Sequence, residues 1–353
     1  MSVRVIMTCV GGAMAPDLLT HLREDPLLMP YLVGVDASAS AKGRDFVDAF
    51  YQVPWGESED YVESIARIVK EEDIDIVLPG SDQEAFVLSR SRGSISAAGA
   101  VTLTSPMEVL DLIRDKQATY EALGRAGIQV PDYVCVVKIA ELQAAMSNYG
   151  YPHRSIIVKP VVGRGGRGMC VLVGTNDTPP SWIGRGTREM SLDEAPTMER
   201  MSEWFTSGSL MVMPVLKDPA YDVDVLAVKG KAKYALVRQR VNPAGIPFAG
   251  NHVISDAPIR EYCLEVTEAL GLDGLHDIDL MTDNQGRPAL LEINPRMSGS
   301  VVVAHTIGFP IVSAAIAVAL GLEYPTIALT SNATVTLISR AVMVRNQDLS
   351  KNS

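Results

Sequence analysis

A predicted β-hairpin most constrains what this chain can fold into. Its two strands are residues 276–281 and 289–294, and the Asp-Asn-Gln-Gly sequence between them is a strong turn signal. Side chains alternate along a strand, so Glu292 and Asn294 share one face while the apolar residues between them face a core. Pairing the two strands brings Asp279 beside Glu292 and Asn294.

Asp279, Glu292 and Asn294 would then form a pocket lined by oxygen atoms. Mg²⁺ suits such a pocket, because it is a hard ion that binds carboxylates and completes its shell with phosphate oxygens and water. Mn²⁺ accepts similar oxygen ligands. The alternative is a polar strand end whose acids face solvent. Arg296 follows the second strand and adds a positive charge whichever interpretation holds.

Composition narrows the class of protein. The chain has 353 residues, of which 47% are hydrophobic, and its formal net charge is −11. A nucleic-acid-binding surface would be basic, so nucleic acid is not an expected partner. The four cysteines are widely spaced, which argues against a zinc site or a disulfide framework. No apolar run reaches the roughly 18 to 20 residues that span a bilayer and no secretory leader is recognisable, so we expect a cytoplasmic protein with no membrane partner.

Residues 1–105 are predicted to form a parallel α/β lobe. Helical stretches alternate with strand-like runs at residues 3–10, 31–36, 75–79 and 101–104. Gly11 and Gly12 follow the first strand, but without the full Gly-x-Gly-x-x-Gly we favour a tight turn over a dinucleotide site. Ser81, Asp82 and Glu84 follow a later strand, where parallel sheets bind ligands. We expect them to cap the next helix, with substrate contact as the alternative.

A glycine-rich turn is the next candidate site. Lys159 ends a strand at residues 156–160, and the turn after it contains Gly163, Arg164, Gly165, Gly166 and Gly168. Glycine backbones can approach phosphate oxygens closely, and arginine adds charged donors. The lysine precedes the glycines, so the pattern is not that of a P-loop NTPase. A structural hairpin is the alternative to a lid over an anion.

Three further basic residues are candidates. Lys116 lies on a predicted helix and, taken alone, is typical of a solvated helix surface. Arg238 and Arg240 share one face of a predicted strand at residues 235–241, whose alternative is an exposed antiparallel face. We divide the rest of the chain into linker helices with a lid subdomain, residues 106–209, and a C-terminal subdomain with the metal site, residues 210–353.

Together, these features resemble the ATP-grasp superfamily. The resemblance rests on Lys116, on Lys159 with the glycine turn, and on Asp279 with the Glu-Ile-Asn-Pro-Arg sequence at residues 292–296. It is closest to the synthetase domains of carbamoyl-phosphate synthetase large chains and their single-domain relatives, and spans roughly residues 105–322. It implies an α/β and α+β protein, in which an N-terminal parallel pre-ATP-grasp lobe precedes a two-lobed ATP-grasp fold.

The resemblance implies roles at the phosphate end of a nucleotide site. Lys116 and Lys159 resemble the two lysines that hold ATP phosphates, and residues 163–168 resemble the lid that closes over them. Arg296 matches the arginine that steadies the transferring phosphoryl group. The metal ligands of the family match Asp279, Glu292 and Asn294.

The resemblance implies less about the adenosine end. Adenine is expected against the backbone of the hinge that contains Met213, Val215 and Leu216. Relatives often carry glutamates at the positions of Met213 and Ala220, and this chain has neither. Asp218 and Asp222 are the alternatives for the ribose contact.

The implied reaction is an ATP-dependent ligation of small molecules. The γ-phosphoryl group of ATP would move to a carboxylate, and an amine or ammonia would attack the acyl phosphate. Arg238 and Arg240 are candidates to bind that intermediate or the acceptor. The alternatives are a phosphotransferase that stops at the phosphorylated product and a regulatory protein with a degenerate nucleotide site. A homodimer is left open.

Overall fold

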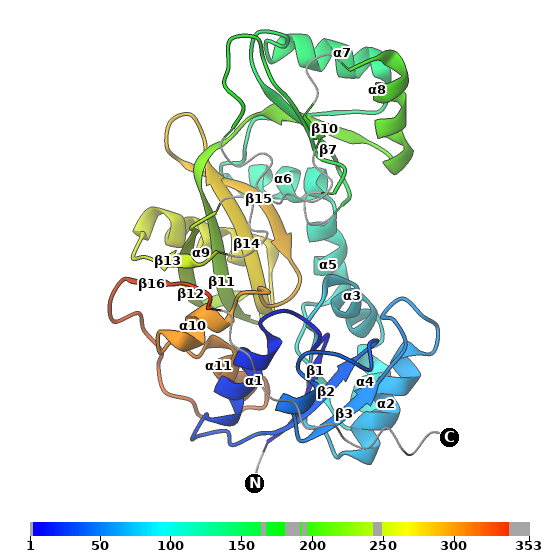
Figure 1. Ribbon diagram of the computed structural model, residues 1–353, viewed down its shortest axis with the longest axis vertical. Coiled ribbons are helices and arrows are strands. Elements are labelled where there is room, and N and C mark those ends of the chain that lie inside the picture. Colours follow the sequence, from blue (N-terminus) through cyan, green and yellow to red (C-terminus); the bar gives the residue numbers. More distant parts are fainter. Residues whose placement is uncertain (1–2, 164–166, 181–190, 193–195, 243–248, 339–353) are drawn as a thin grey trace.

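Three β-sheets follow one another along an elongated molecule (Figure 1). The computed structural model describes residues 3–163, 167–180, 191–192, 196–242 and 249–338. The lobe with β7 and β10 forms one end of the long axis, and the N-terminal lobe with β1 to β4 forms the other. The largest sheet lies between them, so residues from both end lobes can reach it.

The N-terminal lobe is a parallel sheet with helices on its faces. Its strands, in the spatial order β3-β2-β1-β4-β5, are β3 (Ala49–Gln52), β2 (Tyr31–Asp36), β1 (Arg4–Thr8), β4 (Ile76–Leu78) and β5 (Val101–Thr102). Its helices are α1 (Ala15–Arg23), η1 (Arg44–Phe46), α2 (Tyr61–Glu71), α3 (Asp82–Arg90) and α4 (Arg92–Ala98). The central strands are apolar and buried, as expected when helices cover both faces of a parallel sheet.

The middle lobe follows two linker helices, α5 (Met107–Arg114) and α6 (Lys116–Arg125). Its mixed sheet has the order β6 (Val134–Val136), β10 (Leu210–Pro214), β7 (Ile156–Pro160), β8 (Cys170–Leu172) and β9 (Ser191–Leu192). The helical segments of this lobe are α7 (Ile139–Asn148), α8 (Met198–Trp204) and η2 (Phe205–Ser207). β10 follows residue 209, where we expected the subdomain to end, yet it pairs with β6 and β7.

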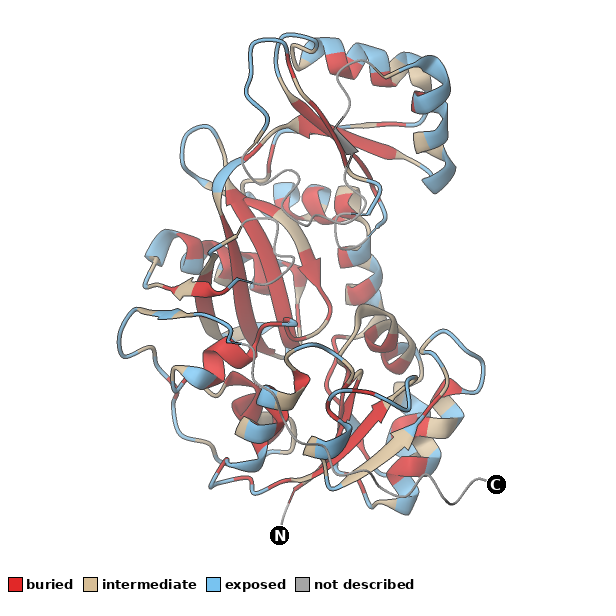
Figure 2. Cartoon of the chain, viewed as in Figure 1, coloured by how far each residue is buried: buried red, intermediate tan, exposed pale blue. Residues whose placement is uncertain are grey.

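The C-terminal lobe is built on a six-stranded antiparallel sheet. Its order is β15 (Pro288–Asn294), β14 (Gly274–Thr282), β11 (Lys217–Val228), β12 (Lys231–Arg240), β13 (Asn251–Val253) and β16 (Ala333–Val335). Helix α9 (Ala257–Leu270) packs against the side chains on one face of the sheet. Helices α10 (Val302–Thr306) and α11 (Ile311–Ala319) pack against the side chains on the other face. The strands are therefore buried on both faces, as Figure 2 shows for β11 and β14.

Alternation along these strands explains where the polar residues gather. On β11 and β12, Leu226 and Leu236 face α11, while Val223, Val225 and Val237 face α9. Residues two positions apart share a face, so the face with α11 turns polar farther along the same strands. The buried polar residues of that face are Asp222, Asp224, Arg238, Asp277 and Asp279.

The predicted fold class is confirmed: a parallel α/β lobe precedes two lobes with antiparallel pairing. Among the helices that the structure describes, none has both the length and the apolar character needed to cross a bilayer.

Gly80 sets how closely the end of β4 approaches β1. A Cβ atom at this position would lie 2.2 Å from the carbonyl oxygen of Thr8. The Gly80 N–H also donates to Thr8 Oγ1 at 2.9 Å. Because the clash is with backbone, no side-chain rotation can relieve it.

We expect Gly80→Ala to lower the free energy of unfolding by about 3 kcal/mol, because overpacking forces the backbone to shift. Gly93→Ala is the matched control: Gly93 lies in α4 and a Cβ atom there would meet nothing within 4 Å, so alanine should be neutral or stabilise by up to about 1 kcal/mol. Urea denaturation measures both variants. Wild-type stability in Gly80→Ala would contradict the close approach.

Candidate active site

The hairpin of β14 and β15 brings the predicted metal-binding residues together. Asp279 pairs with Glu292 across the two strands, and Asp277 pairs with Asn294, which confirms the expected strand pairing. Asn294 Nδ2 donates to Asp277 Oδ2 at 3.1 Å and to Asp279 Oδ2 at 3.4 Å. Asp279 and Asn294 are buried and Glu292 is partly exposed, so the alternative of a strand end facing solvent is wrong for the first two.

A third strand adds further carboxylates to this set. β11 places Asp222 opposite Asp279 and Asp224 opposite Asp277. Carboxylate oxygens of Asp222, Asp277 and Asp279 lie within 4.8 Å of one another, close enough to share one metal ion. This trio shares only Asp279 with the predicted ligands. The structure thus places Asp222, expected as an alternative ribose contact, within an acid cluster made of Asp222, Asp224, Asp277 and Asp279.

Arg238 lies fully buried against the acid cluster. Its Nε is 2.7 Å from Asp224 Oδ2 and its Nη1 is 3.7 Å from Asp222 Oδ2. Nη1 also donates to Asn251 Oδ1 at 2.9 Å and to Ser300 Oγ at 2.6 Å. The alternative of an exposed antiparallel face is therefore wrong for Arg238, whose contacts are internal.

Arg240 lies at the other end of the cluster. Its Nε donates to Asp222 Oδ1 at 2.7 Å, and its Nη2 lies 2.7 Å from Asp279 Oδ1. The guanidinium thus bridges a predicted metal ligand and its neighbour. Because both arginines are held by buried acids, their first effect is to neutralise the carboxylates.

The four carboxylates of the acid cluster outnumber the three arginines that contact them, Arg238, Arg240 and Arg296. Burial raises the pKa of Asp222, but Arg240 and Arg238 outweigh burial and hold that pKa below its usual range. Burial raises the pKa values of Asp277 and Asp279 above theirs, and neighbouring carboxylates add to the rise. Asp277 Oδ1 is buried without a hydrogen-bond partner. An all-oxygen donor set that includes a buried oxygen without a hydrogen bond fits Mg²⁺ or Mn²⁺.

Two lysines face the hairpin acids from the other lobes. Lys116, at the start of α6, donates to the Gly163 carbonyl at 2.8 Å, and its Nζ lies 3.6 Å from Glu292 Oε2. Lys116 is buried, so the alternative of a solvated helix lysine is wrong. Lys159 is also buried and lies above the Tyr120 ring, with Nζ 5.9 Å from the ring centroid. Burial and the charge of Lys116 lower the pKa of Lys159 to about 7.

The glycine turn connects β7 to β8 beside these lysines. The two strands pair antiparallel, from Ile156 with Leu172 to Val158 with Cys170. Gly168 has φ of +71°, a conformation that favours glycine. Of the other turn residues that we predicted to contact phosphate, Gly163 is exposed, whereas Arg164, Gly165 and Gly166 lie outside the described residues.

The predicted adenine hinge leads from β10 into β11. Met213 is buried in the core that also contains Leu216 and Ala220, and Val215 is partly buried against it. Their side chains pack inward. A contact with adenine through backbone groups of the hinge stays a prediction.

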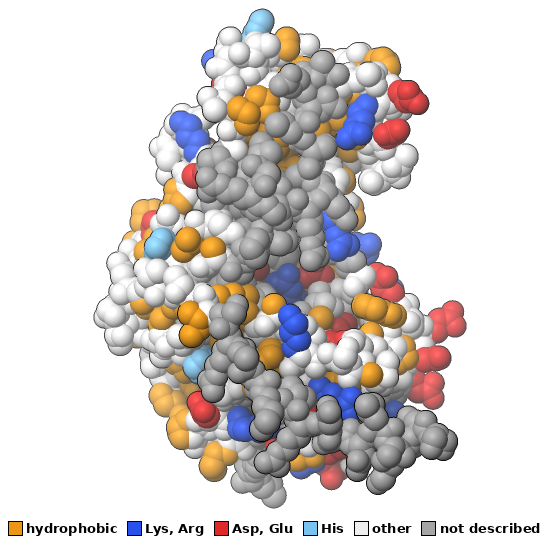
Figure 3. All heavy atoms as spheres, in the orientation of Figure 1, with side chains coloured by type: hydrophobic (Ala, Val, Ile, Leu, Met, Phe, Trp, Pro, Cys, Tyr) orange, Lys and Arg blue, Asp and Glu red, His pale blue; other side chains and the backbone are white. Residues whose placement is uncertain are grey.

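Arg296 joins the site to the N-terminal lobe. Its Nε lies 3.0 Å from Asp82 Oδ1, its Nη1 lies 3.4 Å from Asp277 Oδ2, and Nη1 donates to the Met297 carbonyl at 3.0 Å. Asp82 is the first residue of α3, whose N-cap is Ser81, as predicted. In Figure 3 acidic and basic side chains lie side by side where this face of the molecule is hollowed.

Sequence reasoning missed two residues of this arrangement, Asp277 and Asp224, and it named Asp82 without its contact to Arg296. Asp277 and Asp224 follow the same alternation as Asp279 and Asp222, so strand periodicity could have identified them. No local signal links Asp82 to Arg296, because they come from different lobes.

Comparison with known proteins agrees with this architecture. A family model described as "ATP-grasp in the biosynthetic pathway with Ter operon" matches residues 206–341, and one described as "PylC-like, N-terminal domain" matches residues 27–103.

Curated relatives are much longer than this chain. A pyruvate carboxylase of Pichia angusta is 25% identical over 284 residues, which cover 74% of this chain and 22% of the relative. A carbamoyl phosphate synthase large chain of Hyperthermus butylicus is 24% identical over 273 residues, covering 73% of this chain and 24% of the relative. The chain thus spans about a quarter of the length of these relatives.

Solved structures share the fold at low identity. The biotin carboxylase domain of 2-oxoglutarate carboxylase from Hydrogenobacter thermophilus, solved with MgADP, ADP and bicarbonate, has a TM-score of 0.69 and 18% identity, covering 95% of this chain and 74% of that chain. An L-amino acid ligase from Bacillus licheniformis has a TM-score of 0.61 and 14% identity, covering 89% of this chain and 74% of that chain. The ATP-grasp family model thus matches the C-terminal part of the chain and the PylC-like model matches its N-terminal part, which supports the resemblance to the ATP-grasp superfamily, and the chain shares the fold of the biotin carboxylase domain and the L-amino acid ligase.

Proposed function

We propose that this chain is an ATP-dependent ligase that activates a small-molecule carboxylate as an acyl phosphate for attack by an amine or ammonia. One observation supports the proposal most. Lys116 and Lys159 face the hairpin that carries Glu292 and Asp279, so cationic groups lie opposite oxygen ligands. A triphosphate carries charge suited to the lysines, and its metal ion suits the acids.

In this proposal the acidic residues bind the metal ion and the lysines bind the phosphates of ATP. Asp279, Glu292 and Asn294 would hold Mg²⁺ or Mn²⁺, with Asp277 and Asp222 close enough to contribute. Bound there, the metal ion would neutralise charge on the phosphate oxygens. Lys116 and Lys159 would bind phosphate oxygens, and the turn at residues 163–168 would cover them. The biotin carboxylase domain with the same fold was solved with MgADP, which supports a nucleotide at this fold's site.

The proposed reaction has two steps. In the first, a carboxylate oxygen bonds to the γ-phosphorus, the bond to the β-phosphate bridging oxygen breaks, and ADP leaves. In the second, an amine nitrogen bonds to the acyl carbon, the bond from that carbon to the phosphate oxygen breaks, and phosphate leaves while the nitrogen loses a proton. Phosphoryl transfer depends mainly on positioning and charge neutralisation, which Lys159 and Arg296 would supply in this proposal.

The arginines of β12 have a supporting part in this proposal. Arg240 is partly exposed and bonded to Asp222 and Asp279, so it can orient a metal ligand and meet the acyl phosphate or the acceptor. Arg238 is fully buried, so it would act by holding Asp222 and Asp224 in place. A homodimer and a cytoplasmic location stay predictions; the biotin carboxylase domain was solved as a dimer.

A screen of carboxylic acids, each paired with amines or ammonia, tests the reaction itself. We expect ADP release that requires the acid, together with an amide product detected by mass spectrometry. ADP release with a phosphorylated product and no amide would support a phosphotransferase instead. Nucleotide binding without any turnover across a broad panel would favour a regulatory protein.

Glu292→Gln tests the proposed metal site. Removing one carboxylate charge should lower the rate of ADP release at least about 100-fold, because a bound metal contributes several kcal/mol of charge stabilisation. Glu71→Gln is the matched control, since Glu71 pairs with Arg67 on the exposed face of α2. Circular dichroism should show both variants folded. Normal turnover in Glu292→Gln would remove Glu292 from the metal site.

Lys159 predicts a pH dependence of nucleotide binding. In the folded protein its pKa falls from the ordinary 10.5 to about 7, so above pH 7 the amine is mostly neutral and bound phosphate must draw a proton onto it. Affinity for Mg-ATP should therefore fall as pH rises, by up to about tenfold per pH unit, and should be insensitive to this group below pH 7.

Calorimetry in buffers of different ionisation enthalpy measures that proton uptake. We expect uptake in the wild type at pH 8.5 to exceed uptake in Lys159→Met by nearly one proton, and the two proteins to agree at pH 6. The subtraction removes protons released by the acids when the metal ion binds. Equal uptake in both proteins at pH 8.5 would show that Lys159 is not the titrating group.

Asp82 is expected to act as a positioning residue for Arg296. Asp82→Asn keeps the shape but removes the charge that holds the guanidinium, so kcat should fall by about tenfold while KM for ATP stays unchanged. Asp82→Glu should recover part of the loss. A rise in KM for ATP with normal kcat would instead place Arg296 in nucleotide binding alone.

A further inference from the structure

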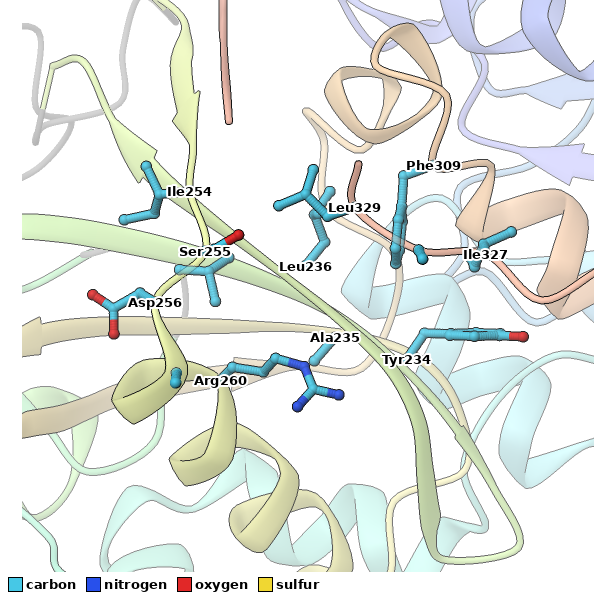
Figure 4. A pocket seen from close by; sticks show the side chains of 13 residues that line it. Tyr234, Ala235, Leu236, Ile254, Ser255, Asp256, Arg260, Phe309, Ile327 and Leu329 are labelled. Atoms are coloured by element: carbon cyan, nitrogen blue, oxygen red, sulfur yellow. The ribbon is translucent and has the colours of Figure 1, made fainter. Parts of the chain in front are cut away.

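A pocket of about 360 Å³ opens beside β12, and none of the residues assigned above to the ligase reaction lines it (Figure 4). In the part of the chain that the structure describes, β13 pairs with residues 238–240 of β12 and with no earlier residue of that strand. Among the described strands, the first half of β12 therefore pairs with β11 on one side and has an open edge on the other. The segment at residues 327–329 lies across from this open edge. The pocket is the space between the two.

The base of the pocket is apolar. Leu236, Phe309 and Ile327 are buried there, and Ile254 and Leu329 extend the apolar wall. A pocket of this volume lies at the lower end of the range typical of small-molecule sites. The size and the lining therefore suit a small ligand with an apolar body.

The rim supplies one available charged group. Asp256 is engaged as the N-cap of α9, where its Oδ1 accepts from the Ile259 N–H at 3.0 Å. Arg260 pairs with Glu261 at 2.7 Å in an exposed ion pair, which costs little to exchange. In Figure 4 the Arg260 side chain reaches toward Ala235, while the Asp256 carboxylate points away from the other labelled side chains.

A second cation lies close to the pocket wall. Lys233 Nζ is 5.6 Å from the centroid of the Tyr234 ring, and Tyr234 lines the pocket. Two charged side chains line the pocket, Asp256 and Arg260; the carboxylate caps α9 and points away from the other labelled side chains, whereas Arg260 reaches toward Ala235, so the positive group is the one turned to the pocket. Charge complementarity favours an anion.

We propose that this pocket binds a small carboxylic acid with an apolar body, such as an aryl or alkyl carboxylate. The ligand lies along the open edge of β12: its apolar part packs on Leu236 and Phe309 on one side of the strand, and its carboxylate replaces Glu261 as the partner of Arg260 on the side that α9 covers. The site is separate from the proposed ligase site, although both use β12. Leu236 lies two residues before Arg238 on the same face of the strand, about 7 Å away along it.

Calorimetric titration of the full chain with 3-phenylpropionate and with 3-phenylpropionamide tests the proposal. The acid should bind saturably, and the amide should bind at least about tenfold more weakly, because a hydrogen bond to a charged group is lost. Arg260→Gln should weaken binding of the acid by a similar factor. Arg67→Gln, which removes an arginine from another exposed helical ion pair, should leave it unchanged.

Two further variants keep the test decisive. Ala328→Trp places a large side chain at an exposed position of the pocket rim and should block binding without altering the melting temperature. Glu292→Gln should bind the acid as well as the wild type does, which separates this site from the ligase site. Equal binding of acid and amide, full affinity in Arg260→Gln, or absence of saturable binding would each overturn the proposal.

Discussion

Burial of opposite charges on one face of the C-terminal sheet is the constraint on which the rest of the structure depends. Asp222 and Asp224 from β11 and Asp277 from β14 lie against Arg238 from β12. An unpaired buried charge destabilises the fold by several kcal/mol. Removing any one of these side chains would therefore leave a buried charge without its partner. A one-residue shift of any of these strands would turn its charges toward the apolar face under α9. The network therefore enforces the strand register that also aligns Asp279 with Glu292.

Neither side of the proposed site is electrostatically balanced by itself. The acid cluster has four carboxylates against Arg238, Arg240 and Arg296, and burial together with the neighbouring carboxylates raises the pKa values of Asp277 and Asp279. On the opposite side, burial and the like charge of Lys116 together lower the pKa of Lys159, so a bound anion would favour its charged form. A triphosphate with its metal ion carries both kinds of charge in one molecule. Binding would thus relieve repulsion on both sides together.

The sequence predicted the parts of the site that local periodicity controls. Alternation placed Glu292 with Asn294, and the turn sequence placed Asp279 opposite them; Ser81 was predicted as a helix cap on the same kind of local signal. Burial of Arg238 could not be predicted, because it depends on β12 lying between β11 and β13 in the finished sheet.

The same limit applies to contacts between lobes. Asp82 contacts Arg296 because the N-terminal lobe docks against the hairpin. No sequence pattern within either segment predicts that docking. Lys116 is typical of an exposed helix in the sequence, but in the structure it is buried, with its Nζ bonded to the Gly163 carbonyl and 3.6 Å from Glu292 Oε2.

The residues of the proposed site come from several parts of the chain, so no single segment contains all of them. The segment that matches the ATP-grasp family model, residues 206–341, contains the acid cluster, Glu292 and all three arginines of the site, but neither lysine. Lys116 and Lys159 come from the linker helix α6 and from β7, and Asp82 comes from α3. The C-terminal sheet by itself would therefore offer acids and arginines without the lysines that face them. Charge complementary to the proposed metal–triphosphate would thus arise only when α6 and the middle lobe are assembled with the C-terminal sheet, and the N-terminal lobe adds Asp82, which holds Arg296.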